Sequence, residues 1–273
     1  MLSPLQLEQF HQNGFVKGSR VLNDAEIEML QRETLRVIDE RETLAQAPVG
    51  QKPVLLHDMG RAGTPLWQIV DIWMASAPFK TLVSSEIIAQ EVQQLTGARE
   101  LRLFHDQIQY KPAAANGKSG GANLWHQDSP YWPILQPKDS EITAWVALDD
   151  VDEENGCMWM IPGSHKWGDA ISDIHEHLGE AEDFFDLPSE HNGHEVRAVA
   201  CPVQRGEVHY HHALTWHGSN VNASSRPRRA IALHYMNENT VFDDSGQHPM
   251  KSFISTPVGE PVRGDAFPQV WPR

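Results

Sequence analysis

The chain has 273 residues, with 22 Lys and Arg against 37 Asp and Glu, which gives a formal net charge of −15 at pH 7. This balance argues against a nucleic acid partner, because phosphate binding needs a basic face. The hydrophobic share of 40% is ordinary for a globular protein. No stretch approaches the ~18 consecutive apolar residues of a membrane span, so no membrane association is expected.

The helical part of the sequence comes first. Ser3, before a proline, is expected to cap one helix, and Asn23 or Asp24 to cap a second whose apolar residues recur at helical spacing. Residues 47–65 are rich in Pro and Gly and predict a loop. A further helix is expected over residues 79–96.

After residue 100 the pattern changes to short strands between turns, which is typical of a sandwich or barrel behind a helical layer. In the strand predicted over 101–111, alternation puts five residues on one face: Leu101, Leu103, His105, Gln107 and Gln109. A charged insertion over 166–195 predicts a helix and a loop. We expect one domain over residues 1–273, with a helical layer at about 1–97 and the β core at about 100–240.

The cysteines and the N-terminus bear on location. Cys157 and Cys201 form no CxxC pattern, so no disulfide framework is expected. The N-terminus lacks a basic segment followed by an apolar run, and we expect no secretory signal. These features favour a reducing, cytoplasmic compartment. A monomer or dimer is expected by default.

A candidate metal site contains His126 and Asp128, which flank Gln127. The tripeptide alone decides nothing, since about one His-x-Asp is expected by chance in so His-rich a chain. On a strand end, the period of two would bring both side chains to the same face. His217, which precedes a Gly-Ser turn, is the best third ligand. Two His and one carboxylate form a facial triad that leaves positions open on Fe(II).

Arginine can supply an anion clamp beside this metal. Arg228 lies eleven residues after His217, and the two could flank a hairpin loop on adjacent strands. A guanidinium grips a carboxylate with two hydrogen bonds. The Ser219 hydroxyl could bind the same carboxylate, and Arg226 or Arg229 could replace Arg228 if the register differs.

The motifs WHQD, AWVALDD, NGCMWMIPGSH, HGSNVN and RRAIALHYM, in this order, resemble the phytanoyl-CoA dioxygenase (PhyH-like) family of Fe(II)- and 2-oxoglutarate-dependent oxygenases. The resemblance runs from the N-terminal helix LEQFHQNGFV to about residue 237. It implies a mainly β fold with flanking helices, the double-stranded β-helix or cupin-like jelly roll.

The resemblance also implies roles for particular residues. The implied iron ligands are His126, Asp128 and His217. Arg228 and Ser219 would bind the far carboxylate of 2-oxoglutarate, and the same pocket would include Lys111, Gln127 and Trp145. O2 is the other co-substrate, and succinate and CO2 are released. Related halogenases have a small residue in place of the carboxylate, so Asp128 favours hydroxylation of a small organic molecule.

Substrate residues are less well specified. Tyr131 and Trp132 could form an aromatic wall, although packing in the core explains them equally well. Gln107 and Asp58 could contact a polar substrate.

Two alternatives stay open. An acyl-CoA hydroxylase of the same family would need a basic groove, for which Lys111, Lys118 and Lys138 are the candidates. A non-catalytic jelly-roll protein would bind a metal or ligand without oxidising anything.

Overall fold

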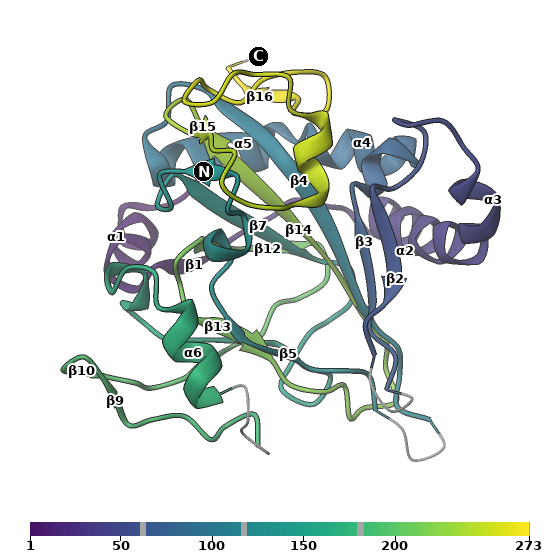
Figure 1. Ribbon diagram of the computed structural model, residues 1–273. Helices are drawn as coiled ribbons and strands as arrows, with labels where there is room; N and C mark the ends of the chain where they lie inside the picture. Colours follow the sequence, from purple (N-terminus) through teal and green to yellow (C-terminus); the bar gives the residue numbers. More distant parts are fainter. Residues whose placement is uncertain (61–63, 116–118, 179–182, 273) are drawn as a thin grey trace.

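The computed structural model describes residues 1–60, 64–115, 119–178 and 183–272. Within them two antiparallel sheets face each other, and helices cover the outer face of the larger sheet (Figure 1). The expected mainly β fold, a double-stranded β-helix with flanking helices, is confirmed. No helix among these residues has the length and apolar character needed to cross a bilayer.

The α-helices are α1 (Pro4–Asn13), α2 (Asp24–Asp39), α3 (Arg41–Ala45), α4 (Ala77–Val83), α5 (Glu86–Thr96) and α6 (Ile171–Leu178). Short 3-10 helices are η1 (Ile72–Met74), η2 (Ser129–Tyr131), η3 (Ser164–Lys166) and η4 (Pro249–Phe253).

The larger sheet has the order β1-β12-β7-β14-β4-β3-β2, and β16 pairs with β4 at one end. Its strands are β1 (Phe15–Arg20), β2 (Leu55–Asp58), β3 (Trp67–Val70), β4 (Leu101–Lys111), β7 (Glu141–Ala147), β12 (Glu207–His212), β14 (Arg228–Asn237) and β16 (Gln269–Trp271). The smaller sheet has the order β11-β8-β13-β5, from β5 (Asn123–His126), β8 (Met158–Met160), β11 (Val199–Cys201) and β13 (His217–Ser219). Two further antiparallel pairs are β6 (Leu135–Gln136) with β15 (Val241–Phe242), which lie far apart in the sequence, and β9 (Glu190–His191) with β10 (His194–Glu195), which form a hairpin.

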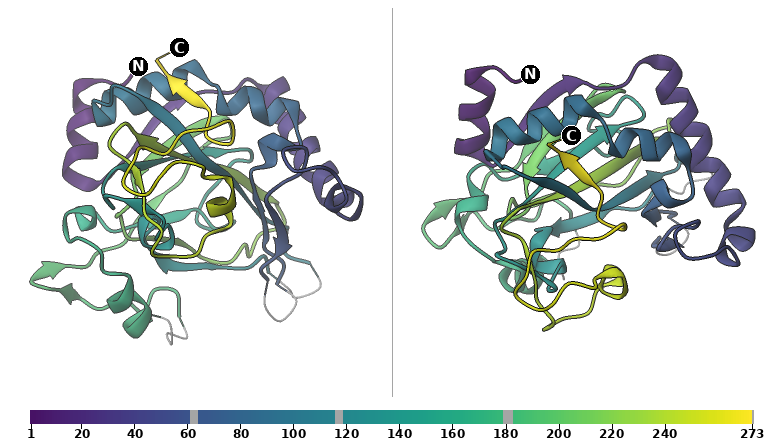
Figure 2. Two further views of the ribbon diagram at one scale, coloured as in Figure 1. Left: turned by 45° about the horizontal axis from the view of Figure 1, so that its top comes forward. Right: turned by 90° about the horizontal axis from the view of Figure 1, so that it is seen from above.

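The N-terminal helices begin at polar caps. The Ser3 hydroxyl accepts a hydrogen bond from the backbone N–H of Gln6, and the Asn23 side chain accepts one from Glu26. Asn23, rather than Asp24, is therefore the cap of α2. These helices and α4 and α5 lie along one face of the larger sheet (Figure 2). They share with it a large apolar core, which fixes the position of the whole sheet.

Two local predictions were wrong. The helix expected over 79–96 is divided into α4 and α5 at Ser84 and Ser85, and the Ser85 side chain caps α5. The loop expected over 47–65 contains β2, which pairs with β3 at the edge of the larger sheet. The division between α4 and α5 has no strong local signal, because it needs only a capping residue within a helical pattern. The strand β2 has none either, because it depends on pairing with β3, which lies later in the chain.

A bulge divides β4 into two parts. Tyr235 on β14 pairs with Leu103 and His234 pairs with His105, so Phe104 is an extra residue in β4. Leu101 and Leu103 consequently lie in the core under the helices, whereas His105 and the alternate residues after it line the interior cavity. The expectation that all five residues share one face is thus wrong for the two leucines, because a bulge reverses the alternation.

The insertion between β8 and β11 contains α6, which lies beside β5 and β13, and the β9–β10 pair, which lies beyond α6 (Figure 1). This agrees with the helix predicted for residues 166–195; residues 179–182 lie outside the described part of the chain. Between the two sheets, buried apolar residues form a second core, including Trp145, Met158, Met160 and Ala232.

Ile231 provides a test of the main core. Its side chain is fully buried between β4 and β7, opposite Ile108 and Val146. We expect Ile231→Ala to lower the free energy of unfolding by about 2–5 kcal/mol, since it leaves a cavity under the helices. Urea denaturation measures this free energy. The control is Leu5→Ala, at an exposed position of α1, which should change the free energy of unfolding by less than about 0.5 kcal/mol. Equal effects of the two substitutions would contradict this account of the core.

Candidate active site

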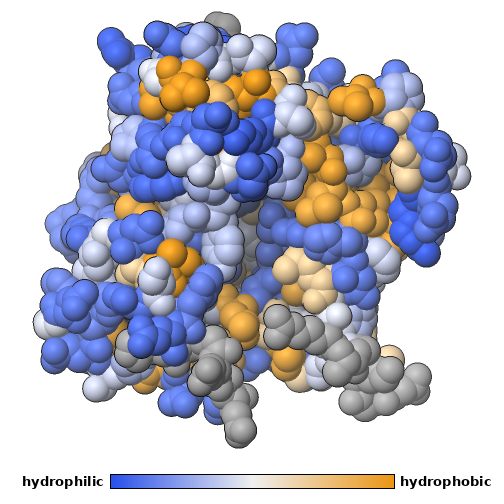
Figure 3. Space-filling view, viewed as in Figure 1, coloured by the Kyte–Doolittle hydropathy of each residue, from blue (hydrophilic) through white to orange (hydrophobic). Residues whose placement is uncertain are grey.

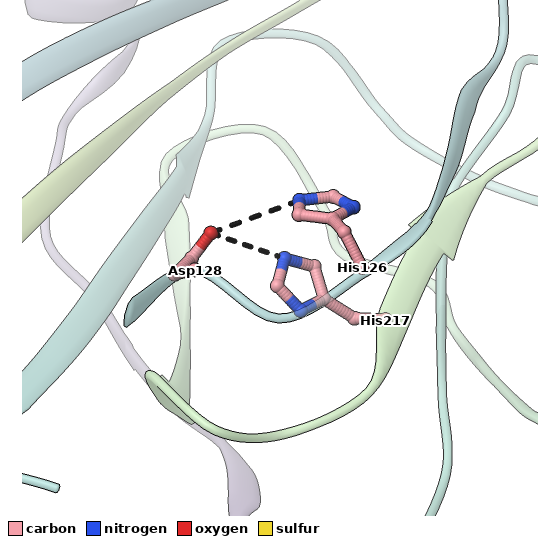
Figure 4. Close-up of side chains that lie close together, drawn as sticks. All are labelled: His126, Asp128 and His217. Carbon is pink, nitrogen blue, oxygen red and sulfur yellow. Dashed lines mark ion pairs between the residues drawn. The ribbon is translucent and has the colours of Figure 1, made fainter. Parts of the chain in front are cut away.

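Two strands of the smaller sheet bring the predicted metal ligands together. His126 ends β5 and His217 begins β13, and the two residues pair directly across the antiparallel ladder. Asp128 follows β5. Its Oδ1 lies 3.7 Å from Nε2 of His126 and 3.5 Å from Nε2 of His217 (Figure 4). One ligand atom from each residue lies within 4.8 Å of the others, an arrangement that can hold a metal ion.

Backbone carbonyls orient both imidazoles. Nδ1 of His126 lies 2.7 Å from the Leu124 carbonyl, and Nδ1 of His217 lies 2.9 Å from the Thr215 carbonyl. Because a carbonyl oxygen only accepts, each Nδ1 must donate. The Nε2 atoms are then the ones available to ligate a metal, and the rings are fixed in the tautomer that a metal would need.

The far oxygen of Asp128 is fixed by hydrogen bonds from the larger sheet. Oδ2 accepts from the Thr143 hydroxyl at 2.8 Å and from Nε2 of His211 at 3.0 Å. The Thr143 oxygen in turn accepts from Nδ1 of His234 at 2.9 Å. Oδ1 therefore faces the two imidazoles, and the carboxylate cannot rotate without losing these bonds.

Mutual charge interactions tune the three groups. Burial acts to raise the pKa of Asp128, but His217 and His211 outweigh it and hold that pKa well below its ordinary value. Burial lowers the pKa of His126 to about 3. Burial also acts to lower the pKa of His217, but the Asp128 carboxylate outweighs it and leaves that pKa raised. Near neutral pH the site therefore offers a carboxylate and the neutral His126 imidazole, and His217 holds its proton more tightly than an ordinary histidine, so that a metal competes with this proton.

Arg228 is a buried cation that lacks an anion. Its guanidinium is fully buried, and none of its three nitrogens has a hydrogen-bond partner among the described residues. It lies over the Trp145 ring, 4.8 Å from the ring centroid. Burial lowers its pKa to about 10. Such a charge is costly to bury unpaired, so the site fits an anionic group such as the carboxylate of 2-oxoglutarate.

Lys111 and Ser219 lie next to this guanidinium. Lys111 pairs with Arg228 across β4 and β14, and its Nζ donates to the Ser219 hydroxyl at 2.7 Å and to the Ser219 and Asn220 carbonyls. Burial, with a contribution from Arg228, holds the pKa of Lys111 well below its ordinary value. The Lys111 ammonium group thus contacts Ser219 rather than the cavity. Ser219 and Trp145 line the inner space beside the metal ligands.

His217 and Arg228 lie on facing sheets. β13 belongs to the smaller sheet and β14 to the larger one, so the expected hairpin between adjacent strands is wrong. The two residues approach the same interior from opposite sides, which the spacing along the chain could not show.

A cavity of about 810 Å³ extends outward from the metal ligands between the two sheets. The surface is hollowed near the centre of the face shown in Figure 3. Gln107 and Trp132 line this cavity, and Tyr131 lies half-exposed at its rim, where its hydroxyl bonds His175 at 2.8 Å. These are the positions expected of substrate-contacting residues.

Two predicted pocket residues do not line the cavity. The Gln127 amide donates to the carbonyls of Gly168 and Leu214 and accepts from the N–H of Ala170. It points away from its two neighbours because alternate residues of an extended chain face opposite sides. Asp58 is exposed, and its Oδ1 accepts from the N–H groups of Gly60 and Leu66. Both side chains stabilise loops.

Sequence reasoning missed several residues of the site. Thr143 and His234 lie on strands far from WHQD in the sequence, and their contacts with Asp128 depend on the order of strands in the larger sheet. His211 lies on β12 and bonds the same carboxylate oxygen as Thr143. The sequence did show histidines at alternate positions of a strand. That pattern could not show which residue His211 would contact.

The fold and the donor set define a metal-dependent oxygenase of the jelly-roll class. The family model for phytanoyl-CoA dioxygenase (PhyH) matches residues 10–230. The peroxisomal phytanoyl-CoA dioxygenase of Bos taurus is 26% identical over 244 residues, which cover 88% of this chain and 71% of the relative. A probable alpha-ketoglutarate-dependent hypophosphite dioxygenase of Stutzerimonas stutzeri is 32% identical over 57% of this chain and 51% of its own length.

Among solved structures, the non-heme alpha ketoglutarate dependent carbocyclase SnoK from nogalamycin biosynthesis superposes with a TM-score of 0.76. It is 26% identical, and the match covers 98% of this chain and 96% of that chain. The chain belongs to the phytanoyl-CoA dioxygenase family and is an iron- and 2-oxoglutarate-dependent dioxygenase.

Thr143→Val tests the support of the metal ligand. Loss of the hydroxyl bonded to Asp128 should weaken Fe(II) binding about 10–100-fold, as removal of an outer-shell partner typically does. Anaerobic metal titration measures this. Thr81→Val, on the exposed surface of α4, is the matched control and should bind like wild type. Unchanged affinity in the Thr143 variant would show that the hydroxyl does not hold Asp128.

The raised pKa of His217 predicts how metal affinity depends on pH. Because the metal must displace a proton from this imidazole, Fe(II) affinity should be constant well above its pKa and fall below it by about tenfold per pH unit. The fall should begin above 6.5, the ordinary value for histidine. Titrations between pH 8 and 5.5, with circular dichroism to confirm folding, would measure it. A flat profile down to pH 6 would contradict the assignment.

Proposed function

We propose that His126, Asp128 and His217 bind Fe(II), and that the enzyme hydroxylates an unactivated C–H bond of a small organic molecule. The observation that carries this proposal is the unpaired, buried Arg228 in the same interior as a triad of metal-ligating atoms. A facial triad leaves positions for a co-substrate and O2, and the guanidinium supplies the anion site that a dicarboxylate co-substrate needs.

Arg228 would pair with the far carboxylate of 2-oxoglutarate, and the Ser219 hydroxyl would donate to the same group. Lys111 donates to the oxygen of that hydroxyl, which leaves the Ser219 proton free to point elsewhere. Lys111 is therefore a positioning residue in this proposal. Trp145 forms the floor under the guanidinium and excludes water from it.

Iron bound at the triad would supply the activation of O2, coupled to decarboxylation of 2-oxoglutarate to succinate and CO2. The chain supplies orientation: the carbonyls of Leu124 and Thr215 hold both imidazoles so that their Nε2 atoms would be free to bind the metal. The buried walls of the cavity keep water from the reacting atoms. Asp128 would fill a coordination position of the iron with a carboxylate, which supports hydroxylation over halogenation.

An acyl-CoA substrate has less support. The basic groove expected for it would need free lysines, but Lys111 is buried against Ser219, and Lys138 donates to the carbonyls of Ser129, Trp132 and Leu135. Lys118 lies outside the described residues. The relatives named as phytanoyl-CoA dioxygenases share 25–27% identity with this chain. Free CoA as a competitor in a binding assay would separate the two substrate classes.

We also propose a single domain over residues 1–273, a cytoplasmic location, and a monomer or dimer as the working form. The larger sheet contributes to the cores on both of its faces, which supports one folding unit. Cys157 and Cys201 are both free and buried, as expected in a reducing compartment.

Titration of the anaerobic Fe(II) protein with 2-oxoglutarate tests the function. The wild type should develop the weak visible metal-to-ligand band, and His217→Ala should lose it with the metal. Arg228→Met should keep the metal but bind 2-oxoglutarate at least ~30-fold more weakly, because the far carboxylate loses its buried partner.

Arg226→Met is the matched control for this experiment. Its guanidinium is partly exposed and pairs with Asp152 at the surface, so the variant should titrate like wild type. A wild-type protein that binds Fe(II) but gives no band would contradict the proposal. Equal affinities of the Arg226 and Arg228 variants would show that Arg228 does not bind the co-substrate.

A further inference from the structure

Part of the cavity is lined by histidines that are not metal ligands. His105 from β4, His234 from β14 and His248 before η4 all line it, together with Trp132. The ring centroids of His105 and His234 lie 4.6 Å apart, and those of His105 and His248 lie 5.5 Å apart. The bulge at Phe104 turns His105 toward this space and away from the helices.

His105 presents an unused hydrogen-bond acceptor. Its Nδ1 lies 3.3 Å from the Asp106 carbonyl, so Nδ1 donates and Nε2 carries the lone pair. The residue is 2% exposed, and Nε2 has no partner among the described residues. A buried polar atom without a partner costs free energy unless a ligand or water satisfies it.

His248 presents the complementary donor. Its Nδ1 accepts a hydrogen bond from the backbone N–H of Met250 at 3.1 Å, so in the neutral ring Nε2 carries the hydrogen. Burial lowers its pKa to about 4, and burial together with His234 and His248 holds the pKa of His105 well below its ordinary value. Both rings are therefore neutral near pH 7, one an acceptor and the other a donor.

The chemistry of this pair selects among ligand groups. A carboxylate or phosphate only accepts and would leave His105 unsatisfied, whereas an ammonium group only donates and would leave His248 unsatisfied. A hydroxyl both donates and accepts. The described residues that line the cavity include no Lys or Arg, which gives a further reason against an anionic group.

The remaining walls favour an apolar framework. Apolar side chains make up most of this lining, including Leu55, Leu66, Val70 and Leu124, and uncharged amides such as Gln107 and Gln109 supply part of its polar surface. A volume of about 810 Å³ is within the range of small-molecule sites, which bury mostly apolar surface and use a few polar groups for orientation.

We propose that His105 and His248 form a hydroxyl-binding subsite, and that the substrate is an uncharged molecule with an apolar framework and a hydroxyl group. The inference rests on the proposed function and specifies its substrate class. His234 connects the subsite to the metal ligands, since it contacts His105 and donates to Thr143, which holds Asp128. The hydroxyl therefore anchors the substrate beside the iron.

A matched series of probes on one framework tests the subsite in metal-free protein, where neither iron nor turnover is needed. The probes are 2-decalol, 2-decalone, decalin-2-carboxylate and 2-aminodecalin. Binding is followed by NMR of the ¹⁵N-labelled histidine side chains in wild type, with the His105 ring resonances assigned by through-bond correlation to its backbone. We expect 2-decalol to move the Nε2 resonance of His105 and to bind about tenfold more tightly than the other three probes.

Two histidine variants distinguish binding at the subsite from general effects of replacing a histidine. His105→Phe keeps a ring of similar size but removes the acceptor, and it should bind 2-decalol and 2-decalone equally. His11→Phe, on the exposed face of α1, is the matched control and should retain the preference. Retention of the preference in His105→Phe would overturn the proposal.

The wild-type protein gives an independent answer even if the His105 variant does not fold. A His105 resonance that 2-decalol leaves unmoved would mean that the site holds water or nothing, and would overturn the proposal. Tighter binding of decalin-2-carboxylate or 2-aminodecalin than of 2-decalol would overturn the proposal that the substrate is uncharged. Fe(II) and 2-oxoglutarate binding by wild type, measured separately, would leave the proposed function standing in each of these cases.

Discussion

A carboxylate in a protein interior is stable only where hydrogen bonds and opposite charge replace the water that it loses. Asp128 meets this requirement with both oxygens: Oδ2 accepts from Thr143 and His211, and Oδ1 faces His126 and His217. Its partners come from β7 and β12 of the larger sheet and from β5 and β13 of the smaller one. The metal site is thus also a point at which the two sheets are joined.

The interior is divided by charge. Near the metal ligands, Arg228 is a cation without an anion, as a dicarboxylate co-substrate requires. Farther along, His105 and His248 are neutral donors and acceptors without cations beside them. An acidic co-substrate and an uncharged substrate can therefore bind in neighbouring parts of the interior. The buried cation favours the acidic molecule, and the neutral histidines favour the uncharged one.

Much of the architecture could be predicted because it depends on local rules. Ser3 and Asn23 cap helices by hydrogen bonds to residues three positions away, and strand segments after residue 100 show in their alternation. Ser85 and β2 were missed, since the one interrupts a continuous helical pattern and the other depends on pairing with β3. Gln127 and Asp58 were misplaced because a motif does not show which neighbour a polar side chain will bond.

The sequence by itself determined the donor types, their order along the chain and the family, since these follow from residue identity and spacing. Only the tertiary structure decided how they meet. The pairing of His217 with His126, the facing sheets that carry His217 and Arg228, and the bulge that turns His105 into the cavity all depend on strand register. Register is set by packing and hydrogen bonding between segments far apart in the chain, so no local pattern specifies it.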